Sequence, residues 1–245
     1  MDAGFQSRGF LDSAELYDAI YHFKNYARES EHLRGVIDKA VPGARTLLDV
    51  ACGTGAHSQH LKNHYAVDGV DLNQDYLRAA RLKNPVGNYS RGDMAGFDLG
   101  RTYDAVVCLF SAIGYVGTVE RLNLAVAAMA RHVNPGGVLI IEPWLTPDAW
   151  KPGSQFIHTG QLPDGLVCRM SYSGREGKLS ALQLHYLRGS ARGIEHFSER
   201  MELTLFTRGE MTCAFDNAAM QVAYDEEGLI GRGLYLASHQ NLKSN

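Results

Sequence analysis

The chain has 245 residues, of which 45% are hydrophobic and 21% charged, and its formal net charge is −3. This composition is that of an ordinary globular protein, and the length suits one domain with an insertion. Basic residues never run to five in a row and no apolar run approaches the roughly 18 residues of a membrane span, so neither nucleic acid nor a membrane is an expected partner.

The spacing of cysteines and histidines gives no metal site. The ten histidines show no paired ligand spacing, and the four cysteines lie far apart without a C-x-x-C motif. We expect reduced cysteines in a cytoplasmic protein. The first ten residues lack a charged start followed by an apolar core, so we do not expect a secretory signal peptide.

Residues 1–40 are predicted to form a helical lid. Ser13 is a candidate N-cap for a helix over Ala14–Tyr21, and a second helix is predicted over Arg28–Lys39. Three phenols fall within ten residues, and they either pack as amphipathic aromatics or line a pocket: Tyr17, Tyr21 and Tyr26.

The stretch Leu47–Gly55 predicts a buried strand that runs into a glycine turn, followed by a helix from about Ala56. Gly53 and Gly55 permit a sharp turn and a close approach of a ligand, and a helix start favours an anionic group. The third glycine of a dinucleotide fingerprint is missing, which argues against a nicotinamide cofactor. Asp49 at the strand end suits a ligand with a positive amino group.

The next strand, over Tyr65–Leu72, ends at Asp71, which comes 22 residues after Asp49. This spacing fits a β-α-β unit that places an acid at the tip of the neighbouring strand, where it can accept two ribose hydroxyls. An acidic N-cap for the following helix is compatible with that role. Further along, Gly92-Asp93-Met94 would by itself indicate a turn.

Two more parallel strands are predicted over Tyr103–Phe110 and Val138–Glu142, separated by a helix over Thr118–Val133. Their carboxyl ends should open at the ligand crevice of a doubly wound sheet. Trp144, beyond the second of them, either walls an acceptor pocket or packs in the core.

After Leu145 the pattern changes to alternating strands over 166–172, 181–187 and 195–206, which predicts an antiparallel sheet laid over the crevice. A helix over 208–220 and two closing strands, over 220–224 and 233–237, return to the core. We therefore expect a core of residues 41–145 and 207–240, with residues 146–206 as an inserted cover.

The stretch Asp49–Gly55 resembles motif I, in its D-x-A-C-G-T-G form, of the class I S-adenosylmethionine methyltransferases. Beyond it, the chain resembles the N,N-dimethyltransferases that act on nucleotide-linked amino deoxysugars in macrolide biosynthesis. The stretches that carry this resemblance span about 220 residues: Ala14–Asp18, Gly92–Met94, Phe110–Gly114, Ile141–Trp144, Ile194–Phe197, Leu203–Phe206 and Gly231–Tyr235.

This resemblance implies a mostly parallel, seven-stranded, Rossmann-like sheet with an antiparallel lid, and in many members a homodimer. It implies S-adenosylmethionine as methyl donor, with S-adenosylhomocysteine as product, and a small-molecule acceptor. Asp93 would accept from the adenine amine and Met94 would cover the ring. The implied cofactor residues are Tyr17, Tyr26, Asp49, Ala51, Gly53, Gly55, Asp71, Leu72, Asp93, Met94 and Phe110.

The acceptor side is expected to be formed by Tyr17, Tyr115, Trp144, His185, His196 and Arg232. The subgroup has a histidine where this chain has Tyr115. Because an amine or sulfur nucleophile attacks through a neutral lone pair, whereas oxygen usually needs a positioned base, this difference favours nitrogen or sulfur. Tyr17 and Tyr115 would orient the acceptor by hydrogen bonds.

We therefore predict a methyltransferase of natural-product biosynthesis that methylates a nitrogen, such as that of a nucleotide-linked amino sugar. One alternative is S-, N- or O-methylation of a larger apolar product such as a peptide antibiotic. Another is a cofactor-binding module that no longer catalyses. For His185 and His196, a surface or packing role competes with that of a base, and Arg232 either contacts a substrate anion or serves a turn.

Overall fold

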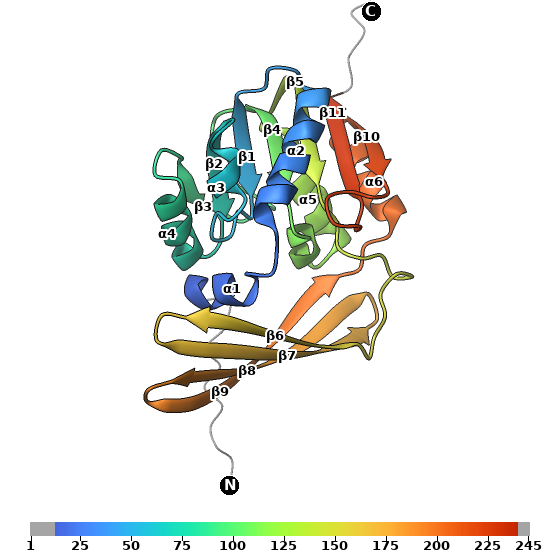
Figure 1. The fold of residues 1–245 in the computed structure, drawn as a ribbon. Coiled ribbons are helices and arrows are strands. Elements are labelled where there is room, and N and C mark those ends of the chain that lie inside the picture. Colours follow the sequence, from blue (N-terminus) through green and yellow to red (C-terminus); the bar gives the residue numbers. More distant parts are fainter. Residues whose placement is uncertain (1–12, 240–245) are drawn as a thin grey trace, which may run out of the picture.

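The computed structural model describes residues 13–239 and contains two separate β-sheets (Figure 1). The large sheet has seven strands in the order β10-β11-β5-β4-β1-β2-β3, and the small one has four in the order β6-β7-β8-β9. The strands of the large sheet are β1 (Thr46–Val50), β2 (Ala66–Asp71), β3 (Tyr89–Arg91), β4 (Tyr103–Cys108), β5 (Val133–Ile141), β10 (Met220–Asp225) and β11 (Leu234–His239).

Strands β1 to β5 pair in parallel, whereas β11 is antiparallel to both β5 and β10. The predicted mostly parallel seven-stranded sheet is therefore confirmed. One boundary differs, because β5 begins at Val133 and takes in the Asn134–Gly137 stretch that was predicted to lie before it; the register between β4 and β5 shifts over this stretch.

Helices cover both faces of the large sheet, as burial on both faces of a parallel sheet requires. They are α2 (Tyr26–Ala40), α3 (Ser58–Leu61), α4 (Gln74–Lys83), α5 (Val119–Ala130) and α6 (Arg208–Asn217). Leu33 and Ile37 of α2 belong to one apolar core, and Leu122 of α5 and Phe215 of α6 belong to the other. None of the helices in the described range is long and apolar enough to cross a membrane.

The small sheet consists of four antiparallel strands, β6 (Gln155–Leu162), β7 (Gly165–Glu176), β8 (Leu179–Ser190) and β9 (Gly193–Thr204). Only three strands were predicted here, and β6 was missed because its residues do not alternate clearly between apolar and polar. The strands are longer than predicted, and the turn between β7 and β8 lies at Gly177 and Lys178, since β7 runs on to Glu176. The inserted antiparallel lid is confirmed, while the proposed boundaries at 145 and 206 stay a prediction.

Helix α1 (Ala14–Ile20) lies between the two sheets (Figure 1). It begins as predicted, with the side chain of Ser13 accepting from the backbone of Leu16 at 3.4 Å. Its Asp18 accepts from Thr54 of the glycine turn and from Lys83 of α4, both at 2.6 Å. On its other side Ile20 is fully buried in the apolar cluster of the lid.

Gly160 of β6 is where α1 comes closest to the lid sheet. A Cβ at this position would lie 2.3 Å from the carbonyl oxygen of Ala19. Gly160→Ala is therefore expected to push α1 away from the sheet and to lower the free energy of unfolding by roughly 1–3 kcal/mol, the usual effect of overpacking. Urea denaturation would measure the loss, and limited proteolysis at α1 would locate it.

Gly189→Ala is the matched control, because Gly189 lies in the same sheet and a Cβ there would meet nothing within 4 Å. Its free energy of unfolding should stay close to that of the unchanged protein. Equal behaviour of the two variants would show that the contact between α1 and β6 does not stabilise the lid.

Candidate active site

A cavity of about 1480 Å³ lies between the carboxyl ends of the parallel strands and the lid sheet. This is the edge at which doubly wound sheets bind ligands. Most of the predicted site residues line it: Tyr17, Tyr26, Asp49, Ala51, Gly53, Asp71, Leu72, Met94, Phe110, Tyr115, Trp144 and Arg232. Four others do not, namely Gly55, Asp93, His185 and His196.

The glycine turn after β1 forms the floor of the cavity. Ala51 has a φ of 57° and Gly53 a φ of 56°, so the backbone here is in the left-handed region that ordinary side chains disfavour. A Cβ on Gly53 would meet nothing within 4 Å, which leaves its backbone open to a ligand. The amide of Gly53 donates to Asp71 at 2.8 Å, and this bond ties the turn to the end of β2.

Gly55 makes the predicted sharp turn but does not line the cavity. Its φ is 74°, and a Cβ there would lie 2.9 Å from Cα and Cβ of Ala80. Gly55 therefore allows the turn to pack closely on α4 and does not face the cavity. The helix after the turn also differs, because α3 begins at Ser58 and has four residues, so its dipole is too short to attract an anion strongly.

The two acids at the strand tips differ in their surroundings. Asp49 is buried and accepts from the hydroxyl of Ser58 at 3.1 Å, and burial raises its pKa to about 6. Burial also raises the pKa of Asp71, although backbone amides of Gly53 and Asn73, both at 2.8 Å, oppose the rise. Both carboxyls face the cavity, Asp49 below the turn and Asp71 beside it.

Asp93 is turned away from the cavity, although Met94 lines it. The backbone amide of Ala95 and the guanidinium of Arg121, 2.7 Å away, bind its two oxygens and hold its pKa below the usual range. Asp93 does not line the cavity, and its contact with an adenine amine stays a prediction.

The segment after β4 is strained where it enters the cavity. Phe110 and Ser111 have φ values of 51° and 63°, and the backbone amide of Phe110 donates to Glu142 at 2.6 Å. Burial raises the pKa of Glu142, and the guanidinium of Arg232 opposes the rise. Residues held in such conformations cluster at functional sites, where the surrounding structure fixes them.

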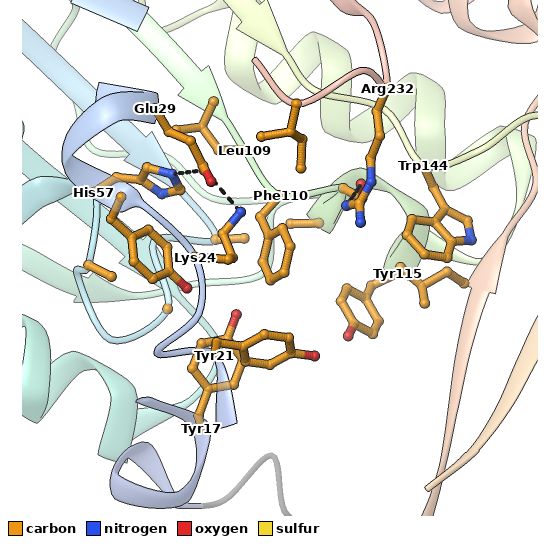
Figure 2. A pocket seen from close by; sticks show the side chains of 18 of the residues that line it. Tyr17, Tyr21, Lys24, Glu29, His57, Leu109, Phe110, Tyr115, Trp144 and Arg232 are labelled. Carbon is orange, nitrogen blue, oxygen red and sulfur yellow. Dashed lines mark hydrogen bonds and ion pairs between the residues drawn. The ribbon is translucent and has the colours of Figure 1, made fainter. Parts of the chain in front are cut away.

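A buried charged cluster at the cavity wall was not predicted from the sequence. Glu29 lies 2.9 Å from the ammonium of Lys24 and 3.0 Å from Nε2 of His57, as Figure 2 shows. The Lys24 ammonium also lies 3.8 Å above the centre of the Phe110 ring. Burial lowers the pKa of Lys24, while hydrogen bonds from His57 and Lys24 outweigh burial and lower that of Glu29. His57 lies 28 positions after Glu29 in the sequence, so no local pattern indicated the cluster.

Tyrosines face one another across the open part of the cavity (Figure 2). The rings of Tyr17 and Tyr21 are 4.6 Å apart, and Tyr115 stands opposite them. Burial raises the pKa of both Tyr17 and Tyr115 above the usual range, so both phenols stay protonated and can donate hydrogen bonds.

Arg232 is a half-buried cation on the far wall, close to Trp144 (Figure 2). Its guanidinium carbon lies 5.0 Å from the Trp144 ring and 5.5 Å from the Phe110 ring, and Nη1 donates to Ser111 at 3.1 Å. Burial lowers the pKa of Arg232, and Glu142 opposes that effect. This side of the cavity can accept an anion.

His185 and His196 lie outside the cavity, contrary to our expectation for the acceptor site. Both are exposed on the outer face of the lid sheet, with rings stacked 5.4 Å apart. The reason is strand alternation: Leu184, Tyr186 and Glu199 point inward, so residues one position away point outward.

The inner face of the lid adds three polar residues that the sequence analysis missed: Arg169, Tyr186 and Glu199. Arg169 donates to the hydroxyl of Tyr21 at 3.0 Å, and Tyr186 donates to Glu199 at 2.7 Å. The period-two alternation of β7 to β9 was the available signal. Within residues 13–239 no cluster of three or more histidines, cysteines and acids is arranged to hold a metal ion.

Known proteins resemble this chain over nearly its whole length. It is 40% identical over 237 residues to a dTDP-3-amino-3,6-dideoxy-α-D-glucopyranose N,N-dimethyltransferase of Streptomyces fradiae, covering 95% of this chain and 93% of that one. It is 38% identical over 230 residues to a dTDP-3-amino-3,4,6-trideoxy-α-D-glucopyranose N,N-dimethyltransferase of Streptomyces venezuelae, covering 92% of this chain and 97% of that one.

Solved structures agree. A sugar N-methyltransferase from Streptoalloteichus sp. superposes with a TM-score of 0.89 at 38% identity and covers 98% of this chain and 99% of its own. An S-adenosylmethionine-bound amino pentose methyltransferase from Micromonospora echinaspora, involved in calicheamicin biosynthesis, superposes with a TM-score of 0.82 at 40% identity. The match covers 89% of this chain and 93% of that one.

Binding of S-adenosylhomocysteine should depend on pH through Asp49. An ionised carboxylate attracts the ligand's ammonium, and the pKa of about 6 in the free protein means that Asp49 is protonated at lower pH. Affinity is therefore expected to be constant near pH 8 and to fall as the pH drops through about 6. Calorimetric titrations between about pH 8 and about pH 5 would measure this.

Asp49→Asn should bind more weakly and without this fall. Asp71→Ala, which removes the predicted ribose contacts, should lose roughly 1–3 kcal/mol of binding free energy at every pH. Its affinity should still fall as the pH drops. An affinity of the unchanged protein that stays constant down to about pH 5 would show that the amino group binds elsewhere.

The family model for a methyltransferase domain matches residues 47–137, which contain the glycine turn, Asp71 and the segment after β4. The open backbone at Gly53 and the acid at the tip of β2 fit the cofactor that such enzymes use. With relatives 35–40% identical over at least 92% of its length, the chain belongs to the family of S-adenosylmethionine-dependent methyltransferases that includes the dTDP-amino sugar N,N-dimethyltransferases.

Proposed function

We propose that this enzyme transfers methyl groups from S-adenosylmethionine to the amino nitrogen of a nucleotide-linked deoxysugar during antibiotic biosynthesis. The relatives named above act on dTDP-linked amino sugars, and a further one from Saccharopolyspora spinosa, named as a dTDP-4-amino-2,3,4,6-tetradeoxy-D-glucose N,N-dimethyltransferase, is 35% identical over 92% of this chain. These names support an amino sugar as the acceptor here.

The main support for the proposal is the size and charge of the large cavity between the two sheets. Its volume of about 1480 Å³ exceeds the roughly 300–1,000 Å³ of ordinary ligand pockets, so it has room for the methyl donor together with a second molecule of nucleotide size. The half-buried guanidinium of Arg232, on the wall opposite the Glu29 cluster, supports binding of a diphosphate there.

The chemistry of the site suits a nitrogen acceptor. The bound cofactor supplies an activated methyl group, and the protein supplies alignment and a dry cavity. Tyr17 and Tyr115 stay protonated and act as hydrogen-bond donors or acceptors rather than as strong bases. Tyrosine at position 115 therefore favours an acceptor that attacks through a neutral lone pair.

The direct test is incubation with S-adenosylmethionine and dTDP-3-amino-3,6-dideoxyglucose, with products followed by mass spectrometry. We expect successive addition of one and two methyl groups. Arg232→Lys keeps the positive charge beside Glu142 but loses the bidentate geometry, so it should weaken binding of thymidine diphosphate roughly tenfold while affinity for S-adenosylhomocysteine is unchanged.

Arg188→Lys on β8 is the matched control, since Arg188 pairs with Asp164 at 2.9 Å and does not line the cavity. It should bind both ligands normally. Failure of the unchanged enzyme to bind thymidine diphosphate, with normal binding of S-adenosylhomocysteine, would contradict the nucleotide-linked acceptor and favour a different natural product.

We further propose that the enzyme is a homodimer in the cytoplasm. Large apolar side chains are exposed together on the outer face of the lid sheet, and a second copy of this face would bury them: Ile157, Leu166, Met170, Leu187 and Ile194. Patches of this kind usually mark interfaces. All four cysteines are free, which supports a reducing compartment.

Leu187→Glu should convert the dimer to a monomer, because it places a charge in the middle of this face. Sedimentation velocity would measure the change, and binding of S-adenosylhomocysteine should persist. Gln183→Glu, which is exposed on the same face of β8, is the control expected to remain a dimer. A monomeric unchanged protein would contradict the assignment.

A further inference from the structure

We propose that Glu199, on the inner face of the lid, binds the protonated acceptor amine and removes its proton before methyl transfer, so that the site selects amines over hydroxyls. This inference rests on the amino-sugar acceptor proposed above and names the group that recognises it. It assigns a role to a carboxylate that lies far in sequence from the glycine turn.

Glu199 is held in a defined orientation. It lies in the middle of β9 opposite Leu184 of β8, half-buried, with its side chain at the cavity wall. The hydroxyl of Tyr186 donates to its Oε1 at 2.7 Å. Tyr186 is itself fully buried and stacks on Phe197 with ring centres 4.8 Å apart, so the donor cannot move freely.

Glu199 lies on the cavity wall close to Tyr115. Met201, two residues further along the same face of β9, has its sulfur 2.9 Å from the Tyr115 hydroxyl. Two residues of a strand span about 7 Å, so Glu199 lies that far along β9 from Met201, the residue that contacts Tyr115. Tyr115 belongs to the 3₁₀ helix η2 (Ala112–Val116), directly after β4.

Tyr115 and Tyr76 are both close enough to Glu199 and Asp71 to feel the charge of each carboxylate. Burial raises the pKa of each phenol, and the carboxylates of Glu199 and Asp71 both add to the rise. Since Asp71 is predicted to hold the cofactor's ribose, to which the sulfonium is attached, the space between these two acids is where donor and acceptor meet.

Arg169 of β7 is a charged group on the same inner face of the lid, and it is buried beside Tyr186. Its guanidinium is directed at the Tyr21 hydroxyl at 3.0 Å and at His158 Nδ1 at 3.3 Å. Tyr186 therefore lies between a cation and an anion. The two oxygens of a carboxylate can accept several hydrogen bonds at once, so an ammonium can bind Glu199 beside Tyr186 and the other contacts of this side chain.

Methyl transfer to the amine needs only Glu199, the cofactor and water. An alkyl amine is mostly an ammonium at neutral pH and has no lone pair for attack. Transfer of one proton to Glu199 gives a neutral amine and a neutral carboxylic acid. The nitrogen lone pair then forms the C–N bond while the C–S bond breaks, its electron pair remains on sulfur, and Glu199 returns its proton to water.

The same charge disfavours a hydroxyl acceptor. A hydroxyl cannot form an ion pair with the carboxylate, and the oxyanion needed for its attack would be repelled by it. Recognition and selectivity thus come from one group, in a site where Tyr115 supplies no strong base.

The test compares the binding of two ligands that differ only at the acceptor, dTDP-3-amino-3,6-dideoxyglucose and its 3-hydroxy counterpart. Titrations contain S-adenosylhomocysteine, so no turnover occurs. The unchanged enzyme should bind the amine roughly tenfold to a hundredfold more tightly, the range of a charge-assisted hydrogen bond. Glu199→Gln, which retains an acceptor for Tyr186, should bind the two ligands about equally.

Glu202→Gln is the matched control, because Glu202 lies on the outer face of the same strand and pairs with Arg200 at 2.6 Å. It should keep the full preference for the amine. Unchanged affinity for S-adenosylhomocysteine would show that both variants are folded. A structural role of Glu199 would weaken both sugars alike and leave their ratio unchanged.

The outcomes separate this inference from the proposed function. If the unchanged enzyme binds neither sugar nucleotide, the amino-sugar function is wrong and the assignment of Glu199 with it. If it binds both without preference, or if Glu199→Gln retains the preference, the inference is overturned while the proposed function stands.

Discussion

The cavity depends on how the lid sheet is held over the large sheet. On one side α1 packs against β6 and bonds through Asp18 to the glycine turn and to α4. On the other side Thr204 of β9 donates to the carbonyl of Gly117 at 2.8 Å, and Trp144 donates to Ser180 at the same distance. Two sheets that pack face to face usually fill the space between them with side chains. Here the lid is held at two edges, so the cavity between the sheets stays open.

The open middle holds charges that would be unfavourable in an apolar interior. They are paired: Lys24 with Glu29 and His57, and Arg232 with Glu142 nearby. Because these pairs are fixed before a ligand binds, the cavity presents charge without rearranging. This is the condition under which electrostatic groups contribute most to binding and catalysis.

Backbone strain adds to this preorganisation. Ala51, Phe110 and Ser111 all have positive φ values and all follow the parallel strands β1 and β4 at the cavity. Hydrogen bonds hold the second of these segments, from the amide of Phe110 to Glu142 and from the hydroxyl of Ser111 to the carbonyl of Pro143. A methyl transfer needs its two reactants in line, so a rigid floor serves the reaction.

The local sequence pattern was enough to predict the parallel core, since Leu47–Gly55 contains a buried strand, a glycine turn and an acid within nine residues. The same short-range logic located Asp71 and the inserted antiparallel sheet. It failed for β6, whose weak alternation hides a strand that its neighbours impose, and it did not show that Gly55 packs against Ala80.

The sequence by itself thus determined the strand-turn units of the core and the residues at the strand tips, because these depend on local patterns, and its resemblance to motif I indicated the methyl donor. Only the tertiary structure decided which lid residues face the reaction. His185 and Glu199 lie on neighbouring strands and look equally able to act, yet alternation and register turn the first outward and the second inward. Likewise the Glu29 cluster exists only once α2 packs against the glycine turn, a contact that no local pattern encodes.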